Sequence, residues 1–207
     1  MNRGTNHRER NPSQGATVIN RGDTVVNPVT GERLTFLKTS RETDGELVLI
    51  EAVVRPDGFV AAKHVHPCQS ERFEVISGRL TMTAGRKKIE LGPGESYTVE
   101  PGAAHKFENK GDVEVRFTCE VRPALSFEAL IETMYGLAAD GKTNKKGMPN
   151  PLRLAVIAKH HFDHVRLPVV PHALQKAALA MGAPIGRSLG YDAVYVPAAG
   201  EPAAAAA

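Results

Sequence analysis

The stretch GFVAAKHVHPCQSERFEVISG, residues 58–78, determines how the rest of the chain is interpreted. Two histidines, His64 and His66, stand two positions apart, and side chains at that spacing lie on the same face of an extended strand. Glu71 follows in a second alternating run, and Gly78 ends that run at a turn. Two imidazoles and a carboxylate on neighbouring strands would supply three ligands for a metal ion.

A second segment, GESYTVEPGAAHKFEN, residues 94–109, offers a fourth ligand in His105. Together the two segments resemble the two sequence motifs of the cupin superfamily. The members of the first motif stand at the family spacing: Gly58, His64, His66, Glu71 and Gly78. The second motif agrees at Gly94, Pro101, Gly102, His105 and Asn109. It departs from the family pattern at Glu100, where a proline is usual.

The resemblance spans roughly residues 30–122. It implies a mainly β fold, the cupin (jelly-roll, double-stranded β-helix) antiparallel barrel, followed in this chain by C-terminal α-helices. It also implies one divalent metal ion per chain, with Fe2+ favoured and Mn2+, Ni2+, Cu2+ or Zn2+ compatible with the same ligands. The implied ligands are His64, His66, Glu71 and His105. A barrel that keeps the motif without holding a metal is the alternative.

Composition divides the chain into four segments. Residues 1–22 are polar and predict a mobile tail. Residues 23–122 carry short β-prone runs between turn residues, which is typical of a barrel without any family knowledge. Residues 123–196 predict a helical extension, and residues 197–207 are a low-complexity tail.

The helical extension begins after Pro123. Ser126 is a typical N-cap residue, and apolar side chains then recur at helical spacing as far as Asp140. Such a stripe needs a partner surface, so we expect this helix to pack on the outside of the barrel. The basic loop 141–150, GKTNKKGMPN, and the later helices are expected to shield one end of the barrel or to meet a twin subunit.

Two further helices are predicted beyond that loop. Asn150 as cap and a proline at the first helical position predict a second helix that runs to about residue 164. A third is expected from about residue 172 to 180, with residues 182–186 breaking it. The second helix contains three histidines, of which residues 160 and 164 share a helix face. They are either a second metal site or solvated surface residues: His160, His161 and His164.

Two phenylalanines are expected near the metal ligands. Phe73 and Phe107 lie two residues beyond Glu71 and His105, on the same strand faces, so they would make the walls of a pocket apolar. Barrel core is the favoured interpretation of this pair, and stacking on a substrate is the alternative. Apart from the four ligands, the sequence identifies no catalytic residue.

Composition excludes several classes of protein. The chain of 207 residues has a net charge of +3 with dispersed basic residues, so no nucleic acid partner is expected. No apolar run reaches the about 20 residues of a transmembrane segment, and the N-terminus lacks the apolar core of a secretory signal. Cys68 and Cys119 are too few for a disulfide scaffold. The expected localisation is therefore cytoplasmic.

Two function hypotheses follow. The first is a metal-dependent enzyme acting on a small organic molecule in the barrel, with a dioxygenase, hence an oxidoreductase, favoured. The resemblance also covers isomerase, cyclase and decarboxylase reactions. The second is a non-catalytic small-molecule binding or sensor barrel, because the same fold serves both roles. Cupins commonly pair through an edge strand or a swapped N-terminal strand, so the resemblance also implies a homodimer.

Overall fold

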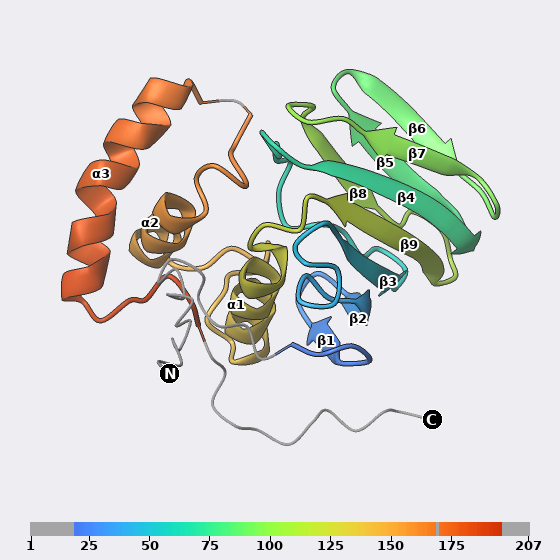
Figure 1. Cartoon of the computed structure of the whole chain (residues 1–207), viewed down its shortest axis with the longest axis horizontal. Helices are drawn as coiled ribbons and strands as arrows, with labels where there is room; N and C mark the ends of the chain where they lie inside the picture. The colour runs from blue at the N-terminus through green and yellow to red at the C-terminus, as the bar shows by residue number, and fades with distance from the viewer. Residues whose placement is uncertain (1–18, 169, 196–207) are drawn as a thin grey trace, which may run out of the picture.

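A computed structural model describes residues 19–168 and 170–195 (Figure 1). The predicted tail 197–207 and residues 1–18 of the predicted N-terminal tail lie outside the described residues. Ile19, by contrast, is buried in the hydrophobic core, and the Gly22 N–H donates to the carbonyl of Phe36 at 2.8 Å. Ordered structure in the described chain therefore begins before residue 23, because an apolar side chain anchors the segment ahead of the first strand.

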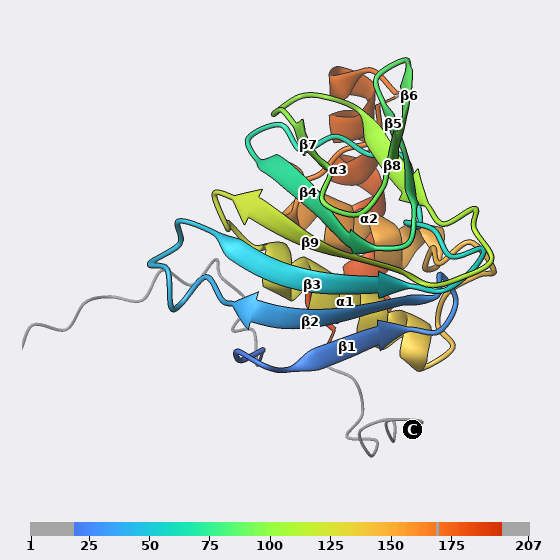
Figure 2. The ribbon, with the colours of Figure 1, turned by 90° about the vertical axis from the view of Figure 1, so that its right-hand side faces the viewer.

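Six strands form the larger of two sheets (Figure 2). In sheet order they are β1 Thr24–Asn27, β2 Glu32–Lys38, β3 Val48–Val54, β9 Val115–Arg122, β4 Ser70–Ser77 and β7 Ser96–Val99. Every pairing in this sheet is antiparallel. Alternate side chains of β3 are buried, which turns one face of the sheet toward the core.

Three strands form the smaller sheet, in the order β6 Lys87–Leu91, β5 Leu80–Ala84 and β8 His105–Glu108. Its pairings are also antiparallel, and β5 and β6 form the predicted hairpin. Phe107 of this sheet packs against Phe73 and Phe117 of the larger one, with ring centroids 6.1 and 5.5 Å apart. The described residues between 46 and 122 contain no helix, so the predicted antiparallel barrel is confirmed.

Gly78, at the end of the first motif, is needed for the close packing of the barrel. Its φ is +78°, a left-handed conformation that favours glycine. A Cβ atom at this position would lie 2.6 Å from the carbonyl oxygen of Glu114, so any side chain would push β9 away. This glycine therefore lets the turn after β4 sit against the start of β9.

Three helices follow the strands, as predicted, and lie on one side of the larger sheet (Figures 1 and 2). They are α1 Phe127–Ala139, α2 Pro151–His160 and α3 His172–Ser188. Phe127 and Tyr135 of α1 belong to the same hydrophobic core as the strands. The expectation that this helix packs on the outside of the barrel is therefore wrong. Instead the helix packs against β1, where the larger sheet extends beyond the smaller one.

The second and third helices differ from the prediction at their ends. The second stops at His160 rather than 164, and the third continues through residues 182–186 to Ser188. Gly186 does not break α3, because it is a packing position: a Cβ there would lie 2.5 Å from the Leu152 carbonyl oxygen of α2. The two helices therefore form a tightly packed hairpin, hereafter the α2–α3 hairpin.

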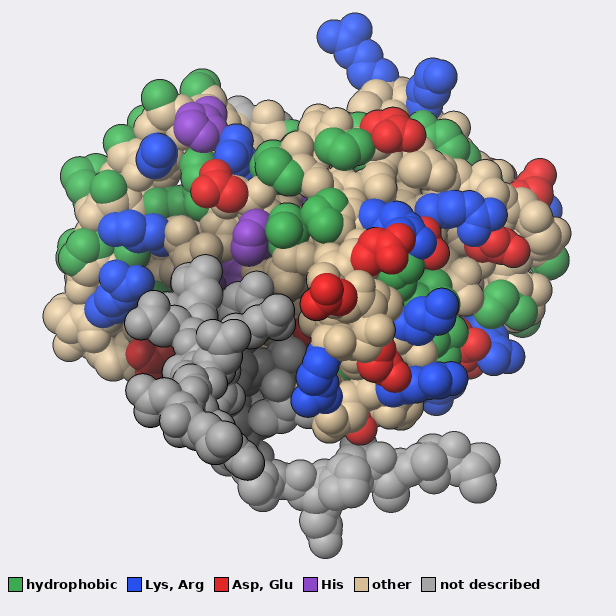
Figure 3. All heavy atoms as spheres, viewed as in Figure 1, with side chains coloured by type: hydrophobic (Ala, Val, Ile, Leu, Met, Phe, Trp, Pro, Cys, Tyr) green, Lys and Arg blue, Asp and Glu red, His purple; other side chains and the backbone are tan. Residues whose placement is uncertain are grey.

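Acidic and basic side chains are interspersed over the strands on the face shown in Figure 3. Among the helices that the structure describes, none has the length and apolar character needed to span a bilayer.

Candidate metal centre

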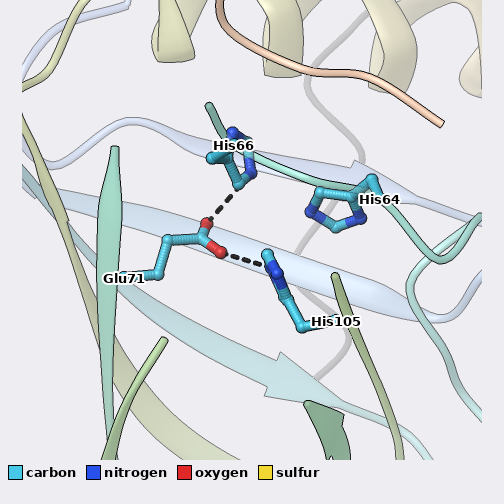
Figure 4. A group of neighbouring side chains, drawn as sticks. All are labelled: His64, His66, Glu71 and His105. Atoms are coloured by element: carbon cyan, nitrogen blue, oxygen red, sulfur yellow. Dashed lines mark ion pairs between the residues drawn. The ribbon is translucent and has the colours of Figure 1, made fainter. Parts of the chain in front are cut away.

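The four predicted ligands meet inside the barrel (Figure 4). His64 and His66 come from the segment before β4, Glu71 from β4, and His105 from the first position of β8. One ligand atom from each lies within 4.8 Å of the others. The exposed fractions of His66, Glu71 and His105 are between 1% and 5%, and His64 is half-buried. This cluster could hold a metal ion.

The backbone brings these side chains together without a full strand. His64 and His105 form two reciprocal backbone hydrogen bonds of 3.0 and 2.9 Å in an isolated β-bridge, so the expected strand at residues 64–66 is reduced to single bridges. Glu100, which stands in place of the usual proline, is exposed, and its carbonyl accepts from the Ala103 N–H at 3.1 Å. The turn that delivers His105 therefore forms without the proline.

Each imidazole is oriented by its second ring nitrogen. The Nδ1 atoms of His64, His66 and His105 donate to the backbone carbonyls of Ala62, His164 and Ala103 at 2.8, 2.8 and 3.1 Å. A carbonyl oxygen only accepts, so Nδ1 carries the proton and Nε2 keeps its lone pair. This outer hydrogen bond is the arrangement that fixes the ring of a metal-ligating histidine.

The closest contact in the cluster supports the same interpretation. Nε2 of His105 lies 2.6 Å from Oε2 of Glu71, and yet neither atom has a hydrogen-bond partner among the described residues. With Nδ1 protonated, two lone pairs face each other at this separation. They repel unless a positive charge, either a proton or a metal ion, lies between them. The donor set therefore fits a cation.

The pKa shifts differ between members of the cluster: burial opposes protonation of His105, but the contact with Glu71 outweighs it and raises the pKa of that ring. Burial opposes ionisation of Glu71, but the neighbouring His66 and His105 outweigh it and hold the pKa of that carboxyl at about 2. Burial, together with His105 and His66, lowers the pKa of His64 to about 4. At neutral pH the site thus presents a carboxylate and an unprotonated imidazole, the forms in which these groups bind metals.

Comparison with known proteins agrees with the fold. Residues 50–121 match the family Cupin_2, the cupin domain, and all four side chains of the cluster fall within the match. The chain carries a cupin domain. An uncharacterized protein of Methanocaldococcus jannaschii is 34% identical over 80 residues, which are 39% of this chain and 63% of that protein. The match thus spans less than two thirds of this curated relative.

Several solved cupin structures resemble the fold over about half of the chain. A sugar phosphate isomerase of the cupin superfamily from Silicibacter pomeroyi has a TM-score of 0.42 at 19% identity, over 51% of this chain and 71% of that one. A predicted oxalate decarboxylase from Thermotoga maritima has 0.45 at 16%, over 49% and 90%. A polyketide cyclase from Streptomyces resistomycificus has 0.43 at 20%, over 52% and 80%. These are likenesses of fold alone.

The cluster of His64, His66, Glu71 and His105 borders a cavity of about 750 Å³. Phe73 and Phe107 are among the residues that line it, and both also belong to the hydrophobic core. Most of the remaining lining is apolar and comes from strands and helices alike, including Leu34, Ile50, Phe117, Ile131, Met134 and Leu179. Sequence reasoning missed these residues, because a cavity between a barrel and later helices leaves no local signal.

The segment after α2 is hydrogen-bonded to the segment that carries the candidate ligands His64 and His66. Val65, which stands between two of the histidines, forms two backbone hydrogen bonds of 2.9 Å with Arg166. His164 supplies the carbonyl that holds the ring of His66. The C-terminal extension therefore covers the cavity and is joined to the site, rather than being a separate appendage.

Two further polar groups line the cavity: Glu32, which the sequence did not single out, and His161, which it indicated only as part of a second metal site. Glu32 of β2 is 5% exposed, accepts from the Thr30 hydroxyl at 2.6 Å and is hydrogen-bonded to Tyr135. Burial raises the pKa of Glu32 to about 7, although both hydrogen bonds oppose the shift. His161, just beyond α2, also lines the cavity. A buried acid of near-neutral pKa is able to exchange protons at physiological pH.

The second metal site considered from the sequence is not formed. The four-residue cluster is the one group of three or more potential ligands that meets within the described residues. His160 is exposed, whereas Nδ1 of His161 and Nδ1 of His164 both contact the hydroxyl of Ser126. Ser126 is indeed the N-cap of α1, but its hydroxyl makes no capping bond because it is engaged by these rings.

Proposed function

We propose that this cupin is a metal-dependent enzyme that acts on a small, largely apolar organic molecule, with dioxygenation as the favoured reaction. The observation that carries the proposal is the convergence of four ligating side chains, with ligand atoms within 4.8 Å of one another, at the wall of an apolar cavity of about 750 Å³. Cavities of this size accommodate a small organic molecule almost completely.

The proposed cofactor is one divalent ion per chain, with Fe2+ favoured, held by His64, His66, Glu71 and His105. Such an ion polarises a bound oxygen atom, lowers the pKa of water, or orients dioxygen beside a substrate. Three neutral imidazoles and one carboxylate leave a net positive charge at a divalent ion. An anionic or strongly polar group of the substrate is therefore expected to approach this end of the cavity.

The protein's own residues would orient the ligands and exclude water. The carbonyl acceptors of Ala62, Ala103 and His164 hold the three rings, and Phe73 and Phe107 keep the adjoining wall apolar. In such a dry environment, charges at the site interact more strongly than in water.

A specific observation favours a second candidate, a proton-transfer reaction of the isomerase or cyclase type. Glu32 lines the same cavity, and its pKa of about 7 suits a group that both donates and accepts protons. A third possibility is the non-catalytic binding barrel. The apolar cavity supports binding in all three cases, so turnover is the property that separates them.

The test begins with protein purified without an affinity tag. Metal content is measured by mass spectrometry, and oxygen consumption is followed with a panel of largely apolar phenols, alcohols and carboxylic acids after loading with Fe2+. One metal ion per chain and substrate-dependent oxygen uptake support the favoured reaction. Turnover without oxygen uptake that is lost in Glu32→Gln supports proton transfer. Binding of metal and ligand without turnover would identify the protein as a non-catalytic binding barrel.

The homodimer expected from the resemblance also remains a proposal. Its test is the mass of the protein in solution at micromolar concentration, by light scattering. A monomer mass at that concentration would exclude the dimer.

A further inference from the structure

His161 is a buried polar side chain whose role the metal cluster does not explain. Its exposed fraction is 0%, and it follows directly after the last residue of α2. One ring nitrogen, Nδ1, lies 2.8 Å from the Ser126 hydroxyl, whereas Nε2 has no hydrogen-bond partner among the described residues. A buried nitrogen without a partner destabilises the folded protein, so such atoms call for an explanation.

A ligand in the cavity is the partner that the position of His161 suggests, because this residue is one of those that line the cavity. The side chain itself is fully buried. Burial lowers the pKa of His161 to about 3, and His160 and His164 add to the effect, so the ring is neutral at pH 7. A neutral imidazole presents either one N–H or one lone pair at Nε2, depending on its tautomer.

Ser126 allows both tautomers. Its hydroxyl contacts Nδ1 of His161 and Nδ1 of His164, and a hydroxyl has one hydrogen to donate. One ring therefore accepts from the serine while the other donates to it, and exchanging these roles changes Nε2 of His161 from donor to acceptor. A ligand hydroxyl both donates and accepts, so it satisfies Nε2 in either state.

The same turn also touches the metal centre. Three residues after His161, the carbonyl of His164 holds the ring of His66, and Arg166 pairs with Val65. Hence a group bound at His161 lies toward the metal end of the cavity, while the rest of a ligand meets mostly apolar walls.

We propose that Nε2 of His161 hydrogen-bonds a hydroxyl group of the substrate, and that the substrates are largely apolar alcohols or phenols. The hydroxyl sits near the part of the molecule that approaches the metal. The inference rests on the proposed function only in its statement about which part of the substrate approaches the metal. Recognition of the hydroxyl by His161 does not require a metal.

The test compares two probes of nearly equal size, 2-naphthol and 2-methylnaphthalene, which differ in carrying a hydroxyl or a methyl group. Binding of each to the full chain is measured by equilibrium dialysis, with metal-loaded and with chelator-treated protein. His161→Asn keeps a group at the position of Nδ1 for Ser126 but none at Nε2. His161→Gln keeps a polar group near Nε2, and His160→Asn is the exposed control.

The wild type is expected to prefer 2-naphthol by about 10-fold, the effect of one buried hydrogen bond. This preference, the ratio of the two affinities, should disappear in His161→Asn and persist in His161→Gln and His160→Asn. An unchanged preference in His161→Asn, or a wild type that binds neither probe, overturns the inference. If the protein bound no metal but still showed the His161-dependent preference for 2-naphthol, the proposed metal enzyme would be refuted and this inference would stand.

Discussion

Replacing Glu32 by glutamine is expected to stabilise the protein at alkaline pH. The folded-state pKa of this carboxyl, about 7, lies above its ordinary value of 4.5, because burial disfavours the charged form. The folded protein therefore binds the proton more tightly than the unfolded chain does. The free energy of unfolding of the wild type thus falls as the pH rises from 4.5 through 7, and the loss is complete above 7.

The size of the effect follows from the two pKa values. They differ by about 2.5 pH units (7 minus 4.5), and each unit corresponds to about 1.36 kcal/mol, which gives about 3 kcal/mol. Glutamine imitates the protonated carboxyl: its carbonyl accepts from Thr30 and its amide donates to Tyr135. At pH 8 we therefore expect Glu32→Gln to be about 3 kcal/mol more stable, relative to wild type, than it is at pH 4.5.

The assay is urea denaturation followed by circular dichroism at several pH values between 4.5 and 8. Only the difference between variant and wild type is interpreted, because groups common to both cancel. Glu90→Gln, at an exposed position of β6, controls for the loss of one negative charge. If the stability difference between Glu32→Gln and wild type stayed constant across this pH range, the carboxyl would not be buried as described.

Three further outcomes are expected. His64→Ala combined with His105→Ala should abolish metal binding in mass spectrometry; full occupancy would place the site elsewhere. Truncation after Arg122 removes two aromatic side chains from the core, so it should cost solubility or lower the melting temperature by about 10 °C or more in calorimetry, and an unchanged melting temperature would contradict the packing described. Gly186→Ala pushes α3 away from α2, so it should destabilise the protein by about 1–3 kcal/mol in urea denaturation. Gly182→Ala, whose Cβ would meet Ala155 at 3.1 Å, is expected to destabilise it less, and equal effects would count against close contact at residue 186.

The strands and the four converging side chains could be predicted from the sequence because their signals are local. Alternation over a few residues identifies a strand, and His64, His66 and Glu71 occur within a single short segment. The outer hydrogen bond of His66 could not be predicted in the same way. Its acceptor, His164, lies in the helical extension and is brought to the site by the tertiary fold alone.

The errors in the helices have the same physical origin. From the local sequence alone, Gly186 is predicted to break the helix. In the fold, its small size is required because Leu152 of α2 packs against it. Ser126 reads as a capping side chain, but two histidines 35 and 38 residues away engage its hydroxyl. Glu32 has the local pattern of an ordinary charged strand residue, but in the fold it is 5% exposed and hydrogen-bonded to Tyr135 of α1. In each case a tertiary contact overrides the local preference.

The backbone bridge between Val65 and Arg166 links the segment of His64 and His66 to the connection between α2 and α3. That connection supplies none of the four candidate ligands. Because the bridge lies between His64 and His66, any opening of the α2–α3 hairpin at this point disturbs the positions of both imidazoles. Thermodynamic linkage then requires the reverse: a metal that binds the ordered histidines makes opening of the hairpin less favourable by the same factor. Metal removal should therefore speed amide hydrogen exchange in α2 and α3, although neither helix would touch the ion. The rate of amide hydrogen exchange in the α2–α3 hairpin would thus report how much metal is bound.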